Sequence, residues 1–455
     1  MIEFKMSDFF YPLDLVSTYL LLRRSERWSV AQFEAYQADR LLRLLRHCAA
    51  QVPYYAPVFR RAGLDVDRLS DGDVLASLRK LPVLDKDTLR ESPELFLARN
   101  AHRFRPKPVH TSGTTGTPLT VYWDRGSNVM EFCNIQRLWR WARFRIGQPF
   151  LDLRSRPLSG MENHAVLDGD FRYIRNRKVN GLEFSSDFMD DSNITRYYAL
   201  LLRHQPRLVR GHPQSIQHLI DLLTRNGLSG WQPRAVTTAS ETLHDFQRRQ
   251  IEEAWHVPVL DSYGLIEHNV FIAQCPLGSY HISPEYGICE IVGDDGNPTP
   301  PGEEGWIVAT GLHNFAQPLL RYNTRDRAIA AGDEVCPCGR TLPTVRRIVG
   351  RIDDCLHTAD GRRYSGLSFA FFGLRGVKKA RFVQEDLERV TVELVTTSEF
   401  DQAERNRLAG ILAAKVDHKL AFDFKLVDVI EQTSLGKSKF VVSNVSGEVD
   451  KAEGC

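Results

Sequence analysis

Three consecutive units of strand, turn and helix between residues 207 and 261 constrain the fold of this chain more than any other feature. Residues 207–211 read as a strand that leads into a helix starting at Pro213 and stopping near Gly227. Residues 234–239 precede an amphipathic stretch at 243–255, and 257–261 follow as the next strand. This alternation predicts parallel strands with right-handed crossovers, and such sheets bind ligands at the carboxyl ends of their strands. Those ends carry residues 211–212, 240–241 and 261–264.

The flanking segments have other patterns. The first hundred residues are mostly helical, with a capping-box start formed by Ser29 and Gln32. Residues 285–330 read as strands between Gly and Pro turns, which predicts antiparallel strands and a small barrel packed on the sheet. The last hundred residues alternate again, with strands at 390–395 and 424–429 around a helix at 403–420, and predict a compact C-terminal domain.

The charge balance argues against two classes of protein. The chain has 59 basic and 57 acidic residues and a formal net charge of +2, whereas nucleic-acid binders and polybasic membrane-surface proteins show a basic excess. The apolar run 9–22 is interrupted by Pro12 and Asp14, so we expect a packed helix there and neither a membrane span nor a signal peptide. Eight dispersed Cys residues and no export signal predict a cytoplasmic protein with reduced thiols.

The strongest local motif runs from His110 to Pro118 and consists almost entirely of Gly, Ser and Thr. Glycine lets the backbone approach an oxygen closely, and the amide and hydroxyl groups supply the hydrogen-bond donors that a polyphosphate needs. No Gly-Lys-Ser/Thr sequence follows, so this is not the Walker pattern. From these residues alone, a polar surface turn is the alternative to a phosphate-binding loop.

Five motifs in order resemble those of the adenylate-forming superfamily, which includes acyl-CoA synthetases, peptide-synthetase adenylation domains and luciferases. They lie at residues 111–118, 261–267, 321–326, 350–354 and 434–437. Residues 53–55, 81–86 and 336–340 are similar to phenylacetate–CoA ligases and CapK-type capsule-biosynthesis proteins. The resemblance implies an α/β fold: a large ATP- and acid-binding domain over 1–352, with parallel-containing sheets, helices and a small β subdomain, and a mobile α+β lid over 353–455.

The resemblance also implies a nucleotide site. The residues that would cradle the phosphates of ATP are Thr111, Ser112, Gly113, Thr114, Thr115 and Gly116. Tyr263 would stack on adenine, Asp261 would accept from the adenine amine, and Asp326 would bind the ribose hydroxyls. The remaining residues expected along this pocket are Ser240, Glu241, Ser262, Gly264 and Arg351.

The implied chemistry needs cations, because a carboxylate must approach an anionic phosphate. Glu267 would hold Mg²⁺. Lys437 would be the catalytic cation at the α-phosphate, with Lys439 as the alternative lysine. Asp353 would be the hinge on which the small domain turns.

Cys275 and His281, with Cys336 and Cys338, form a second constellation. Three thiols and an imidazole suit tetrahedral Zn²⁺, and four protein ligands leave no open position, so we expect a structural zinc site. Buried cysteines and a hydrogen-bonded histidine are the alternative. Cys289 and Cys355 are expected only to pack.

Some residues depart from the pattern of the superfamily or have two readings. Ile266 replaces a hydroxyl residue before the glutamate, Thr117 and Leu119 leave the loop without its lysine, and Arg325 stands where Gly is usual. Arg125 is a substitute cation for that lysine. The other ambiguous residues are His212 and His268, either of which could face the substrate, and Phe132, Trp139, Trp141 and Phe144, which we expect in the core.

Three functions follow from these observations. The leading hypothesis is an ATP-dependent acid–CoA ligase acting through an acyl-adenylate, with an aromatic or arylacetic acid as the resemblance-based choice. The second keeps the adenylation but passes the acyl group to an amine, a hydroxyl or a carrier-protein thiol. The third, motivated by Ile266 and the altered loop, is a non-catalytic nucleotide-binding protein. The expected ligands are ATP, Mg²⁺, coenzyme A, zinc and a small carboxylic acid, and a homodimer is left open.

Overall fold

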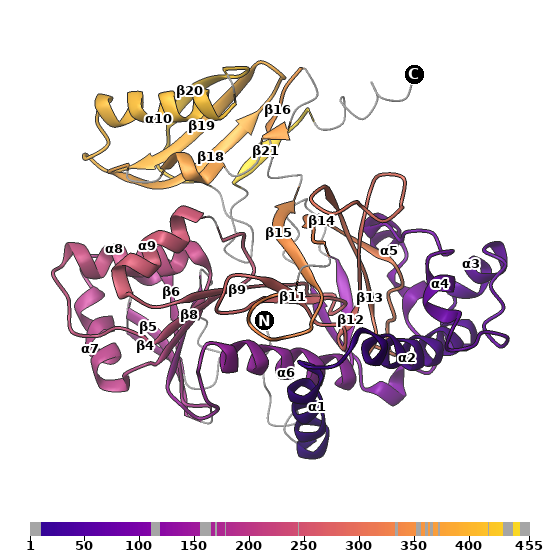
Figure 1. Cartoon of the computed structure of the whole chain (residues 1–455). Coiled ribbons are helices and arrows are strands. Elements are labelled where there is room, and N and C mark those ends of the chain that lie inside the picture. The colour runs from indigo at the N-terminus through magenta and orange to yellow at the C-terminus, as the bar shows by residue number, and fades with distance from the viewer. Residues whose placement is uncertain are drawn as a thin grey trace.

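The structure is a computed structural model that describes residues 11–110, 119–154, 165–168, 171–177, 179–243, 245–332, 335–351, 356–359, 363–364, 367–371, 374–416, 418–430 and 440–445. None of the helices in these ranges is both long enough and apolar enough to span a bilayer. Figure 1 shows a large body that contains the N-terminal and central parts of the chain and a smaller C-terminal unit above it.

The N-terminal hundred residues are helical, as predicted. The helices are α1 (Pro12–Ser25), α2 (Val30–Gln51), α3 (Tyr55–Arg61), α4 (Val74–Leu78) and α5 (Lys86–Glu91), followed by two 3-10 turns, η2 (Pro93–Phe96) and η3 (Ala101–Phe104). Helix α2 begins with the predicted capping box between Ser29 and Gln32. Its buried leucines pack with α3, α4 and α5 in one apolar cluster. Helix α1 is less buried than expected, since Leu13 is 81% exposed.

A single sheet of 13 strands crosses the body. Its central strands β6 (Gly181–Ser185), β3 (Phe150–Arg154), β7 (Leu208–Gly211), β8 (Ala235–Thr238) and β9 (Val259–Gly264) are parallel, as the alternating pattern predicts. The antiparallel hairpin of β4 (Ala165–Asp168) and β5 (Phe171–Asn176) lies beyond β6 at one edge.

On the other side of β9, the same sheet becomes antiparallel. It continues through β10 (Phe271–Gln274), β11 (Tyr280–Ile282), β15 (Thr344–Arg351), β14 (Tyr322–Ala330), β13 (Glu304–Gly311) and β12 (Gly287–Val292). These are the antiparallel strands expected from the Gly and Pro turns. The expectation of a separate small barrel is wrong, because β10 and β11 join these strands edge to edge with the parallel ones.

Helices cover both faces of the parallel strands, and Figure 1 shows α9 and α6 on opposite sides of β9. On one face, α7 (Ile194–His204), α8 (Pro213–Arg225) and α9 (Asp245–Trp255) pack on side chains such as Leu151 and Val236. On the other face, α6 (Arg125–Trp141) packs with Phe150, Leu208 and Leu260. The hairpin of β1 (Lys107–His110) and β2 (Thr120–Trp123) leads directly into α6. The aromatic residues Trp139, Trp141 and Phe144 are buried in the α6 cluster, as expected, and Phe132 packs against it.

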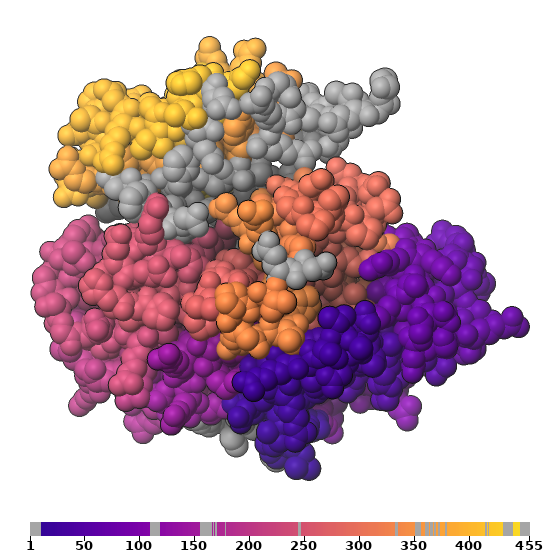
Figure 2. All heavy atoms as spheres, in the orientation of Figure 1, coloured from indigo at the N-terminus to yellow at the C-terminus, as the bar shows by residue number. Residues whose placement is uncertain are grey.

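The C-terminal unit has its own sheet and its own core, and Figure 2 shows it as a separate lobe above the body. Strands β20 (Ala421–Leu426), β19 (Arg389–Thr396), β18 (Val377–Gln384) and β21 (Val441–Ser443) lie in that order, with α10 (Gln402–Lys415) packed on them. The remaining elements of this unit are the short strands β16 (Leu356–His357) and β17 (Arg363–Tyr364) and the 3-10 turn η6 (Leu367–Phe371). The body contains one further 3-10 turn among the described residues, η4 (Ser186–Phe188). The predicted domain boundary at 352/353 lies outside the described residues.

A buried ion pair fastens α6 to the sheet. Arg137 lies 3.1 Å from Glu285, and both side chains are at most 2% exposed. The guanidinium also donates to Ser283 and Asn134, each at 2.7 Å, and Ser25 at the end of α1 donates to Glu285. Loss of one partner would leave the other charge buried and uncompensated.

We therefore expect Arg137→Met to lower the free energy of unfolding by about 3–5 kcal/mol. Arg43→Met is the matched control, because the ion pair between Arg43 and Asp39 is exposed, and such pairs contribute about 0–1 kcal/mol. Denaturant unfolding of the two variants measures the difference. Equal effects would contradict a stabilising role for the buried pair.

Candidate active site

The predicted nucleotide residues of the central sheet lie together at the ends of adjacent strands. Thr238 at the end of β8 pairs in register with Asp261 in β9, which brings Ser240 and Glu241 beside the residues 261–264. Ser240 has a φ of 71°, in the left-handed region that residues other than glycine rarely adopt. Glu241 lies 3.4 Å from Nδ1 of His212, which comes directly after β7. The sheet therefore assembles these strand ends as the alternating pattern predicts.

Asp261 is 5% exposed, and both oxygens of its carboxylate have protein partners. Thr238 donates to Oδ1 at 2.5 Å, and the Tyr280 hydroxyl donates to Oδ2 at 2.9 Å. Burial raises the pKa of Asp261 to about 6, although these hydrogen bonds oppose the shift. The side chain thus fixes the ends of β8, β9 and β11 relative to one another, a contribution that the sequence did not indicate.

Tyr263, Asp326 and Arg351 converge from three strands. The Tyr263 hydroxyl donates to Oδ2 of Asp326 at 2.7 Å, and Asp326 in β14 pairs in register with Arg351 in β15. Gly264 ends β9 opposite Phe271, and the Ser262 hydroxyl donates to the Thr238 carbonyl. The residues expected around adenine and ribose are therefore neighbours in space as well as in motif order.

Glu267 is buried and is held by two side chains that the sequence analysis left without a role. Lys86, the first residue of α5, lies 3.1 Å from Oε1 of Glu267, and the Tyr322 hydroxyl donates to the same oxygen at 2.7 Å. Burial alone would raise the pKa of Glu267, but attraction to Lys86 and the two hydrogen bonds outweigh it and hold the pKa below its usual value. The carboxylate is therefore ionised and suited to a cation.

The hairpin that carries the predicted phosphate loop contacts the segment next to Glu267. His110 and Thr120 pair across the β1–β2 hairpin, so the loop connects two adjacent strands. At the end of β2, Trp123 donates to the Ile266 carbonyl at 2.5 Å and stacks on His268, with ring centroids 4.2 Å apart. The predicted residues that lie outside the described part of the chain are Thr111, Ser112, Gly113, Thr114, Thr115, Gly116, Asp353 and Lys437, as well as the alternative lysine Lys439.

The departures from the superfamily pattern have structural counterparts. Arg325 keeps a φ of 63°, the conformation that favours glycine, and its guanidinium pairs with Asp85 and Asp87 at the start of α5. Arg125 is not placed as the substitute cation, because its side chain contacts Tyr11 and Asp14 near the N-terminus. Lys86 is the cation that contacts Glu267.

The two histidines near the strand ends differ in environment. His212 faces Glu241, as described above. His268 is 4% exposed and stacked on Trp123, and burial lowers its pKa to about 3. His268 is therefore neutral across the physiological range, which makes it a packing residue beside the site.

Cys275, His281, Cys336 and Cys338 come together with their ligand atoms within 4.8 Å of one another. The sulfurs of Cys275 and Cys336 are 3.8 Å apart, close to the roughly 3.8 Å expected for two thiolates about 2.3 Å from a tetrahedral Zn²⁺. Nδ1 of His281 faces the Leu342 carbonyl at 3.2 Å, while Nε2 points to Cys338 at 3.4 Å. An Nδ1–H bond to a carbonyl leaves Nε2 for a metal. Cys289, by contrast, only packs with its neighbours, and Cys355 is outside the described residues.

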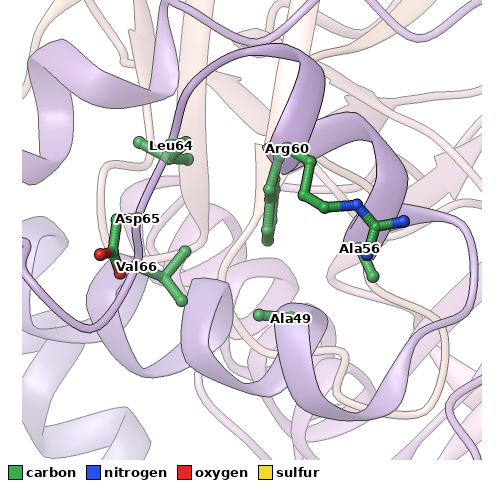
Figure 3. A pocket seen from close by; sticks show the side chains of 7 residues that line it. Ala49, Ala56, Arg60, Leu64, Asp65 and Val66 are labelled. Atoms are coloured by element: carbon green, nitrogen blue, oxygen red, sulfur yellow. The ribbon is translucent and has the colours of Figure 1, made fainter.

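A pocket of about 370 Å³ lies elsewhere, between α2, α3 and the segment that follows (Figure 3). Its lining includes Ala49, Phe59, Leu64 and Val66. It contains no residue of the predicted site.

The residues missed from the sequence are those that hold the predicted ones. Lys86 and Tyr322 lie within motifs that were noticed, so their positions carried a signal. Thr238 and Tyr280 carry no such signal, because their contacts with Asp261 depend on the register of β8, β9 and β11.

Comparison with known proteins agrees with this geometry. Residues 356–444 match the CapK C-terminal domain family. Protein CapK of Staphylococcus aureus is 22% identical over 400 residues, covering 86% of this chain and 85% of CapK. A phenylacetate–coenzyme A ligase of Thermus thermophilus is 25% identical over 337 residues, covering 71% and 72%. The structure of a 2-hydroxyisobutyryl-CoA ligase bound to its acyl-adenylate superposes with a TM-score of 0.71 at 17% identity, covering 95% of this chain and 93% of the ligase. The predicted fold is confirmed.

The raised pKa of Asp261 predicts a pH dependence of stability. Its folded-state pKa of about 6 exceeds the usual 3.8, so its contribution to stability is complete below about pH 4 and is lost as the pH rises through 6. Two pKa units correspond to about 3 kcal/mol. Between pH 4 and 7, the free energy of unfolding of the unchanged protein should therefore fall by about that amount relative to that of Asp261→Asn. Denaturant unfolding at four pH values checks this; a pH-independent difference would contradict it.

Proposed function

This chain is related to protein CapK and the phenylacetate–CoA ligases and has the fold of the adenylate-forming ligases, and on that premise we propose that it is an ATP-dependent carboxylic acid–CoA ligase. The observation that carries the proposal is the hydrogen bond of Tyr263 to Asp326, which joins the expected adenine and ribose residues in the motif order of that superfamily. The proposed acid is aromatic or arylacetic, following the named relatives.

In the proposed nucleotide site, adenine lies against Tyr263 and the ribose hydroxyls bind Asp326 and Arg351. Residues 111–116 receive the phosphates, in line with the resemblance, and the strand that follows them contacts the Ile266 carbonyl, next to Glu267. Glu267 would hold Mg²⁺, which neutralises charge on the departing pyrophosphate. Both side-chain bonds to Glu267 go to Oε1, and an ionised carboxylate of this kind suits a hard cation.

Adenylation requires the carboxylate of the acid to attack the α-phosphate of ATP, which forms the acyl-adenylate and expels pyrophosphate. Two anions approach each other in this step, so a positioned cation lowers the barrier. We assign that cation to Lys437, delivered by the C-terminal unit. Lys86 supplies a second positive charge from α5 and balances Glu267 before nucleotide binds.

Thioester formation follows when the thiol of coenzyme A attacks the acyl carbonyl and AMP leaves. We propose residues 1–352 as the substrate-binding domain and residues 353–455 as a lid that turns at Asp353 between the two steps. The separate core of the C-terminal unit supports this division, because a unit with its own core can move as a body.

A second function is favoured by the match of the C-terminal unit to the CapK family. The lid contributes to acceptor binding in the proposed second step, and the family that this lid matches is not named for a coenzyme A ligase. In that case the adenylate passes its acyl group to an amine, a hydroxyl or a carrier-protein thiol.

We also propose that Cys275, His281, Cys336 and Cys338 bind structural Zn²⁺. The segment 336–341 lies against the turn between α1 and α2: the backbone N–H of Thr341 donates to the Glu26 carbonyl at 3.0 Å, and its hydroxyl donates to the Trp28 carbonyl at 2.6 Å. Zinc would thereby fix the N-terminal helices to β11 and β15.

Exchange of labelled pyrophosphate into ATP, measured across a panel of acids, tests the adenylation. We expect acid-dependent exchange, followed by thioester when coenzyme A is added. Lys437→Ala should reduce exchange about 100-fold or more while ATP binding persists, because the lost cation acts mainly on the transition state. Lys439→Ala is the matched control and should retain most activity.

The same assay separates the alternatives. Exchange without thioester formation favours the second function. ATP binding without exchange for any acid makes this a nucleotide-binding protein without the proposed chemistry.

Metal analysis tests the zinc proposal. We expect about one zinc per chain, and Cys338→Ser should lower both the zinc content and the melting temperature, since metal-binding energy contributes to folding. Cys289→Ser is the control, because Cys289 lies outside the cluster. Zinc-free protein with an unchanged melting temperature would refute the site.

A further inference from the structure

A row of polar side chains crosses the face of the parallel strands that α6 covers. Strand register places in line, from β6 to β8, the residues Glu183, Asp152, Arg210 and Thr237. They share the α6 face with Phe150, Leu208 and Ala235, each of which lies two residues earlier in its strand and packs in the α6 cluster. Charged residues between a sheet and its covering helix are costly unless they have a partner.

Arg210, in the middle of this row, has few protein partners. Asp152 directs both of its oxygens to Arg154, at 2.7 and 2.8 Å. The guanidinium of Arg210 lies 4.0 Å from the Asp152 carboxylate and over the Trp139 ring, 5.8 Å from its centroid. It makes no hydrogen bond to any described residue. Burial lowers the pKa of Arg210. The side chain is therefore a cation with several unused donors.

Two neighbours of Arg210 also carry buried polar groups that could bind a ligand. Thr237 is 2% exposed, and its hydroxyl has no hydrogen-bond partner among the residues that the structure describes. Glu131 extends from α6 and interacts electrostatically with Arg210, and it accepts from the Tyr286 hydroxyl at 2.8 Å. Burial raises the pKa of Glu131 to about 7, so near neutral pH this carboxyl can donate as well as accept. Hydrogen-bond donors and an acceptor are thus gathered around Arg210 on this face.

This row lies next to the strand ends that carry the proposed site, on the α6 face of the sheet. Gly211, Thr238 and Asp261 are in register across β7, β8 and β9, and Arg210 immediately precedes Gly211. Two strand spacings, about 10 Å, separate the backbones of Arg210 and Asp261, whose side chains leave opposite faces of the sheet. The side chains of Asp152, Arg154 and Arg210 are 12–19% exposed despite the covering helix, so solvent reaches this space. An acid whose carboxylate lies at the nucleotide would reach this space around the carboxyl ends of β7 and β8.

We propose that Arg210, with Thr237 and Glu131, binds the end of the acid remote from its reacting carboxylate, and that this end carries an oxygen, as a hydroxyl or a second carboxylate. The oxygen accepts from the guanidinium and satisfies the Thr237 hydroxyl. The inference rests on the proposed ligase function and narrows its substrate class. An arylacetic acid fits only if its ring carries such an oxygen.

The test compares pairs of acids that differ only in the remote oxygen, with the full-length protein and pyrophosphate exchange as the readout. The pairs are 4-hydroxyphenylacetate with phenylacetate, and pentanedioate with pentanoate. We expect at least one oxygen-bearing acid to exceed its partner in kcat/KM by roughly tenfold or more. Arg210→Met should reduce that kcat/KM by about 10–100-fold, mainly through KM, and change the value for the matched acid less than about twofold.

Two further variants keep a structural role distinct from a binding role. Thr237→Val preserves the side-chain shape and removes the unpartnered hydroxyl. It should therefore weaken the preference for the oxygen-bearing acid without lowering the melting temperature. Arg225→Met breaks an exposed ion pair with Asp191 at the end of α8 and should change neither. Exchange that does not distinguish the members of either pair overturns this inference alone, as does an equal loss for both members in Arg210→Met. No exchange with any acid overturns the proposed function and this inference with it.

Discussion

The ion pair between Lys86 and Glu267 joins three parts of the chain that are remote in sequence. Lys86 begins α5 in the N-terminal helices, Glu267 follows β9, and Tyr322 of β14 donates to the same oxygen. Arg325 extends this link, since it pairs with the two aspartates that flank Lys86. The side chains that position the Glu267 carboxylate therefore also hold the helical region against the sheet, and the position of that carboxylate depends on the packing of α5.

The change from parallel to antiparallel pairing occurs where the site lies. Strands β3, β7 and β8 end at the same edge of the sheet as β9, and β10 returns beside β9 to begin the antiparallel half. Polar residues at the parallel ends thus face residues such as Asp326 from the other half. One continuous sheet places both sets without a domain interface between them, which makes this part of the candidate site rigid.

Local sequence signals predicted the individual helices and strands better than they predicted which strands pair and which side chains make contact. The capping box of α2, the start of α8 at Pro213 and the parallel strands followed from short-range patterns. The joining of the antiparallel strands to the main sheet did not, because edge pairing between β9, β10, β11 and β15 depends on contacts far apart in sequence. The cluster of three cysteines and His281 was found because its ligand chemistry is visible in the sequence. The partners of Asp261 were not found, because hydroxyl residues are common and only register selects Thr238 and Tyr280.

Strand β15 connects the zinc cluster to the proposed hinge. Thr344 at its start pairs with His281, and Arg351 at its end pairs with Asp326, immediately before the boundary at residue 353. The strand spans about 24 Å. Its first residues are anchored beside a covalently restrained cluster if metal is bound, and its last residue pairs with Asp326. Rotation of the proposed lid would therefore be confined to the few bonds beyond Arg351, and the proposed ribose-binding residues would keep their orientation between the two proposed half-reactions.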